Sequence, residues 1–99
     1  MINLNLTNLY MSDIDECDNL KEVDRGSIVS TVDCICLRPM KKGDDKYIVC
    51  FNICSSGPDP KVHFRNREDA SKFYDFIISL FAGSTDTLHT VDVLEHNAI

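Results

Sequence analysis

Cysteine is the residue type in this chain with the widest chemistry, because a thiolate can attack a substrate, bind a metal ion or form a disulfide. The chain has five of them, Cys17, Cys34, Cys36, Cys50 and Cys54. Residues 1–11 have neither a basic start nor a continuous apolar block, so we expect no signal peptide. An odd number of cysteines without an export signal favours a reducing, cytoplasmic location with free thiols.

Two cysteine pairs have spacings that place their members on one face of a strand. Cys34 and Cys36 are two residues apart, and Cys50 and Cys54 are four apart. A hairpin centred near Lys42 would set Cys34 opposite Cys50. We interpret these thiols as small apolar side chains in a sheet core, since free cysteine is usually buried. A zinc site or a disulfide remains the alternative, although zinc thiolates usually come from turns.

Other catalytic and cofactor-binding patterns find little support. The three histidines, at positions 63, 89 and 96, have no acidic neighbours at metal-ligand spacing. The four glycines are far apart, so no glycine-rich loop could cradle a phosphate. No strained turn presents a nucleophile beside a base. We therefore expect no enzyme activity, no cofactor and no metal.

The charge of the chain is concentrated in residues 12–24. This segment holds six of the sixteen acidic residues and one lysine, a net charge of −5 out of −6 for the chain. Such a segment is either a solvated surface or a site that imitates a nucleic-acid backbone and binds a basic protein surface. We expect no direct nucleic-acid binding and, without an apolar run of ~18–20 residues, no membrane span. The predicted partner-binding residues are Asp13, Asp15, Glu16, Asp18, Glu22 and Asp24.

The pattern of apolar and turn residues along the chain predicts a single α+β domain over residues 1–99, whose strands and helix must position these residues. Its centre is an antiparallel β-meander over residues 27–65, whose β-branched runs are separated by turn residues. Residues 12–24 form either an acidic helix or a loop. The expected strands are an edge strand within 1–11, the meander strands 27–37, 46–54 and 61–65, and a further edge strand at 88–94, giving a sheet of three to five strands.

A long amphipathic helix is predicted over residues 66–82. Asn66 is a favourable N-cap, and Gly83 is a natural residue to follow the helix. Its apolar arc spans roughly 200°, which is wide for a helix packed on one sheet face. The excess predicts either that the N-terminal segment covers part of the arc, or that a homodimer interface is formed by Phe73, Phe76, Ile77 and Phe81.

The order helix-strand-strand-strand-helix over residues 12–82, the small size and the acidic cluster within 12–24 resemble those of small phage-encoded anti-CRISPR inhibitors. The resemblance implies a non-enzymatic inhibitor that occupies the nucleic-acid-binding face of a partner in the host cytoplasm. A homo-oligomeric structural protein and a cysteine-based metal or redox protein are the alternative functions.

Overall fold

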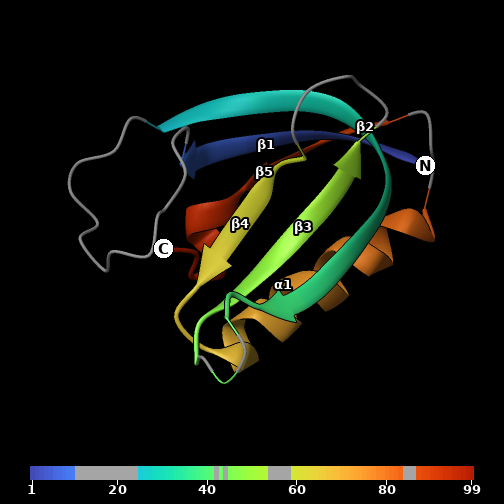
Figure 1. Cartoon of the computed structure of the whole chain (residues 1–99). Helices are drawn as coiled ribbons and strands as arrows, with labels where there is room; N and C mark the ends of the chain where they lie inside the picture. The colour runs from blue at the N-terminus through green and yellow to red at the C-terminus, as the bar shows by residue number, and fades with distance from the viewer. Residues whose placement is uncertain (11–24, 42, 44, 54–58, 84–86) are drawn as a thin grey trace.

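The computed structural model describes residues 1–10, 25–41, 43, 45–53, 59–83 and 87–99 (Figure 1). Their secondary structure is mostly strand, with one α-helix and one short 3₁₀ helix among the described residues. In chain order the elements are β1 (Ile2–Tyr10), β2 (Arg25–Pro39), β3 (Tyr47–Ile53), β4 (Lys61–Phe64), α1 (Arg67–Phe81), β5 (Leu88–Asp92) and η1 (Val93–His96).

The described strands form one five-stranded sheet in the order β4-β3-β2-β1-β5. Neighbouring strands from β4 to β1 are antiparallel, whereas β5 runs parallel to β1. The prediction of an antiparallel meander is therefore wrong, because the sheet is mixed. Strand β5 follows α1, which carries the chain back across the sheet, and an alternating pattern contains no information about strand direction.

The N-terminal strand lies in the interior of the sheet, between β2 and β5, and not at an edge. Its alternation sends Ile2, Leu4 and Leu6 into the core, each at most 2% exposed. The register shifts between Leu6 and Leu9, where Asn8 adopts a left-handed backbone with φ 61°. This irregularity changes the alternation, so that Leu9 also faces the core at 3% exposure.

Strand β2 is the longest element and joins the two parts of the sheet. Its first half pairs with β1 and its second half with β3. A bulge lies between Val32 and Cys34, where Asp33 is the extra residue in the register with β3. Bulges bend a strand and increase its twist. Figure 1 shows β2 arching from the side of β1 to that of β3, so that the sheet curls around the core.

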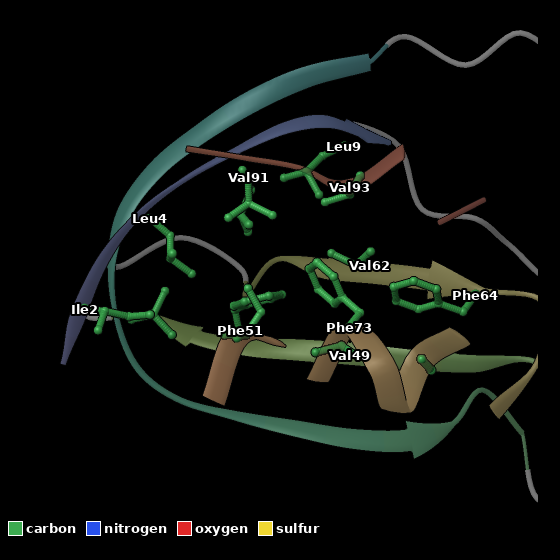
Figure 2. Packing of buried hydrophobic residues seen from close by; sticks show 14 residues of the cluster. Ile2, Leu4, Leu9, Val49, Phe51, Val62, Phe64, Phe73, Val91 and Val93 are labelled. Carbon is green, nitrogen blue, oxygen red and sulfur yellow. The ribbon is translucent and has the colours of Figure 1, made fainter. Parts of the chain in front are cut away.

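The core is filled from both parts of the curled sheet and from α1. Figure 2 shows Leu4 and Val91, from β1 and β5, facing the layer that contains Phe51, Val62 and Phe73. The aromatic ring of Phe73 lies 5.3 Å from that of Phe64 and 6.1 Å from that of Phe51 between centroids. All three phenylalanines are completely buried. Burial of such rings, with their edge contacts, is a main source of stability in a domain of this size.

Helix α1 begins as predicted, with Asn66 as its N-cap. The side-chain oxygen of Asn66 accepts a hydrogen bond from the backbone N–H of Asp69 at 2.8 Å. The helix ends at Phe81, and Gly83 donates its N–H to the carbonyl of Leu80 at 3.1 Å without adopting a positive φ. In the described part of the chain, no helix is long and apolar enough to cross a membrane.

The C-terminal segment packs against the helix and then against the sheet edge. The predicted strand 88–94 ends earlier, at Asp92, whose carboxylate accepts the N–H of Leu94 and caps η1. Asn97 ends η1 in the left-handed conformation, with φ 66°. The N–H of Ile99 then donates to the carbonyl of His63 at 2.8 Å, which ties the chain end to β4.

Candidate functional site

The predicted acidic site, with all six of its carboxylates, lies outside the described residues. The structure does describe how the connection between β1 and β2 is anchored. Tyr10 and Arg25 are partners in the antiparallel register, so residues 11–24 leave and rejoin the sheet at adjacent positions. The guanidinium Nη1 of Arg25 donates to the carbonyl oxygen of Asn8 at 2.8 Å. The described residues that flank the acidic segment, Tyr10 and Arg25, therefore lie side by side at one end of the β1–β2 pair.

The charge outside this segment is nearly balanced. The rest of the chain contains nine lysines and arginines and ten aspartates and glutamates, a net charge of −1. The segment from residue 12 to residue 24 holds the remaining −5. The excess negative charge thus belongs to the stretch of sequence between Tyr10 and Arg25.

The second candidate site is a group of thiols on the outer face of the sheet. Cys34 and Cys36 are exposed, and Cys50 is half-buried. The expectation that these cysteines fill the sheet core is wrong for the first two. Before the bulge, Ile28 and Val32 point inward at even positions, and after it the inward positions become odd. The single extra residue Asp33 therefore turns both thiols outward.

The register of the β2–β3 hairpin pairs Cys36 with Cys50. The expectation that Cys34 lies opposite Cys50 is wrong by two residues, because the turn is centred on Gly43 and not on Lys42. Gly43 has φ 84°, a conformation that glycine adopts readily. Cys34 instead lies opposite Asn52, whose side-chain Nδ2 donates to its sulfur at 3.5 Å.

Positive charge flanks the thiol pair. Burial raises the pKa of the Cys50 thiol, and the neighbouring Cys36 raises it further. A hydrogen bond from Arg38 acts in the opposite direction and favours the Cys50 thiolate. On its other side Cys50 is paired with Lys61 of β4. Sequence spacing did not reveal Arg38 and Lys61 as neighbours of the thiols, because their proximity depends on the register of three strands.

The described residues contain no group of three or more histidine, cysteine, aspartate or glutamate side chains placed to hold a metal ion. The histidines lie on different elements. His96 of η1 contacts Phe73 of α1 edge-on and Phe76 in a tilted arrangement, with ring centroids 5.2 and 4.6 Å apart. His63 is in β4 and His89 in β5, at opposite edges of the sheet.

The predicted oligomer face on α1 is largely used inside the monomer. Phe73 and Ile77 are 0% exposed, so neither can contact a second chain. Phe81 packs against the core, and Phe76, although 38% exposed, is stacked on His96. At one margin of the wide apolar arc His96 of η1 contacts Phe76, whereas Ile78 at the other margin is 43% exposed.

No protein-family model matches this chain, and neither the curated proteins nor the solved structures contain a match to it.

Proposed function

We propose that this protein is a non-enzymatic binding protein that engages a basic surface of a partner protein through the acidic segment 12–24. The observation that carries the proposal is the anchoring of this segment. Tyr10 and Arg25 hold its ends at adjacent strand positions, and the bond from Arg25 to the Asn8 carbonyl fixes the second end. Six carboxylates and one lysine are confined to the span between these anchors.

Anchoring matters energetically because exposed ion pairs are weak one at a time. A solvent-exposed pair contributes only ~0.2–1 kcal/mol after the cost of ordering its two side chains. A connection whose two ends are already fixed loses less backbone freedom on binding than a free tail of the same length. Several carboxylates acting together can then reach a useful affinity and accelerate association with a basic surface.

The most specific form of the proposal is an inhibitor that competes with nucleic acid for a basic groove. Duplex DNA carries one negative charge per ~1.7 Å of its axis, a density that a cluster of carboxylates can imitate. A phage protein directed against a host defence nuclease is one protein of this kind. The proposal requires no catalytic group in this chain.

The test compares two triple charge reversals that change the net charge equally. Asp13, Asp15 and Glu16 become lysine in the first variant. In the control variant Asp45, Asp75 and Glu95, all exposed and outside the acidic segment, become lysine. Each protein is immobilised and exposed to a lysate, and the retained proteins are identified by mass spectrometry.

We expect wild-type protein and the control variant to retain the same basic partner, and the first variant to lose it. Competition by duplex DNA or RNA then distinguishes a nucleic-acid mimic from a simple adaptor. Retention of the same partner by all three proteins would overturn the role of the acidic segment.

A further inference from the structure

We propose that Cys36 and Cys50 are a peroxide-oxidisable pair that closes a reversible disulfide across the β2–β3 hairpin. This site is separate from the acidic segment and does not depend on its role. The two residues are direct partners in the antiparallel register, so their side chains lie side by side on the same face of the sheet. Both are free in this structure.

The strand geometry brings the two backbones within disulfide range. The N–H of Phe51 donates to the carbonyl of Pro60, so Phe51 directs its backbone groups towards β4. Backbone groups alternate along a strand, and Cys50 therefore directs its own towards Cys36 of β2. Such a hydrogen-bonded pair has Cα atoms ~5.5 Å apart, inside the ~4.4–6.8 Å that a disulfide allows. The bond can therefore form with only a local adjustment of the two strands.

The same geometry makes the bond strained and easily reduced. Cβ atoms of directly opposed residues lie ~4.5–5.5 Å apart, and hydrogen-bonded pairs are at the long end of this range. A relaxed disulfide needs a Cβ separation of ~3.8 Å. The two strands must therefore draw together locally when the bond closes. Strained, exposed disulfides are the labile ones, whereas relaxed structural disulfides resist cellular thiols.

Exposure and charge divide the two cysteines into different roles. Cys36 is exposed and can meet a hydroperoxide, whereas Cys50 is half-buried beside it. Arg38 lies beside the pair and favours the Cys50 thiolate, in opposition to burial, and Lys61 is paired with Cys50 on its other side. Cys36 is thus the residue that reacts first with the oxidant, and Cys50 is the resolving residue.

The chemistry balances with hydrogen peroxide as the oxidant. The Cys36 thiolate attacks one peroxide oxygen, an S–O bond forms, and the O–O bond breaks to release hydroxide. The Cys50 thiolate then attacks the Cys36 sulfur, an S–S bond forms, and the S–O bond breaks to release a second hydroxide. The protons from the two thiols convert both hydroxides to water. The two sulfurs lose two electrons in total, and the peroxide gains them.

The test uses the full chain in two forms that each retain two cysteines. The first has Cys17, Cys34 and Cys54 replaced by serine, and keeps Cys36 and Cys50. The control has Cys17, Cys36 and Cys54 replaced by serine, and keeps Cys34 opposite Asn52. Both are treated with hydrogen peroxide, and intact masses are followed over time. Circular dichroism checks that both fold, and a peptide map of oxidised wild-type protein provides an independent measurement.

We expect the first form to lose the mass of two hydrogen atoms and to regain it with millimolar glutathione. The control form should close an internal disulfide at least about tenfold more slowly, because its sulfurs are not opposed. Wild-type protein should give a Cys36–Cys50 linked peptide. Addition of oxygen atoms without an S–S bond, equal rates in the two forms, or a disulfide that resists glutathione would overturn the proposal.

Discussion

Arg25 and Asn8 connect the two ends of the acidic segment, since the Arg25 guanidinium donates to the Asn8 carbonyl oxygen at 2.8 Å. Asn8 is also the residue of β1 with a left-handed backbone, and its side-chain Nδ2 donates to Asp92 of β5 at 2.8 Å. One position in β1 thus links the strand that precedes the segment, the strand that follows it and the edge strand.

Replacement of Asn8 tests the backbone requirement at this position. Glycine and alanine both remove the bond to Asp92, but only glycine adopts a φ of 61° without steric cost. We expect Asn8→Gly to be more stable than Asn8→Ala by about 1 kcal/mol. The free energy of unfolding in urea measures the difference. At an ordinary strand position alanine is more stable than glycine. A more stable Asn8→Ala variant would therefore refute the left-handed backbone at Asn8.

Replacement of Arg25 by alanine tests the anchor itself. The residue is exposed, so the loss of its bond to Asn8 should lower the free energy of unfolding by only about 0.5–1.5 kcal/mol. Partner affinity should fall as well, because the end of the acidic segment is then less well fixed. A variant with weakened stability and fully retained affinity would show that anchoring does not contribute to binding.

Two phenylalanines that lie three residues apart on α1 should contribute very different amounts to stability. Phe73→Ala removes a completely buried ring that contacts Phe51 and Phe64, at a cost of about 3–5 kcal/mol. Phe76→Ala removes a partly exposed ring stacked on His96, at a cost of about 1–2 kcal/mol. Thermal and urea unfolding provide the comparison. Equal losses for the two variants would contradict the packing described here.

The Cys50 thiol should titrate at a higher pH in the folded protein than in the unfolded chain, where a cysteine has a pKa of ~8.5. Burial is the main cause, the adjacent Cys36 adds to it, and Arg38 opposes it, with Lys61 paired on the other side. The pH profile of alkylation at Cys50, with and without denaturant, measures this shift. Arg38→Met should move the folded midpoint to still higher pH. A midpoint that falls in this variant would contradict the role of Arg38.

The sign of the matching stability effect follows from this raised pKa. The unfolded chain releases the Cys50 proton at lower pH than the folded protein does. The contribution of Cys50 to stability is therefore complete below the unfolded pKa and is lost as the pH rises through the folded pKa. The free energy of unfolding in urea can be measured below and above this pH window. It should fall less between the two pH values for Cys50→Ala than for wild-type protein.

Local patterns predicted several elements because they depend on nearest neighbours along the chain. The alternation of Ile2, Leu4 and Leu6 defines one buried strand face. Asn66 caps α1 because its side chain reaches only three residues ahead. These features require no knowledge of the rest of the molecule.

The errors arose where one residue changes the geometry of many. Asp33 carries no sequence signal of a bulge, yet it turns Cys34 and Cys36 outward. The hairpin turn is centred on Gly43, so the partner of Cys50 is Cys36 and not Cys34. The parallel direction of β5 depends on the path of α1 across the sheet. The strand expected over 88–94 ends at Asp92, and the η1 turn that follows it brings His96 against Phe76 of α1, a contact between separate elements that the width of the apolar arc does not predict.

The most direct test of the proposed function is the salt dependence of affinity for a partner recovered by the immobilised protein. Titration calorimetry with wild-type protein should show a dissociation constant that rises at least about tenfold between ~0.05 and ~0.5 M salt. Charge reversal of Asp13, Asp15 and Glu16 should raise the dissociation constant by a similar factor at low salt. Charge reversal of Asp45, Asp75 and Glu95 should change the dissociation constant by less than about threefold. A dissociation constant that is unaffected by salt and by the first reversal would contradict binding through the acidic segment.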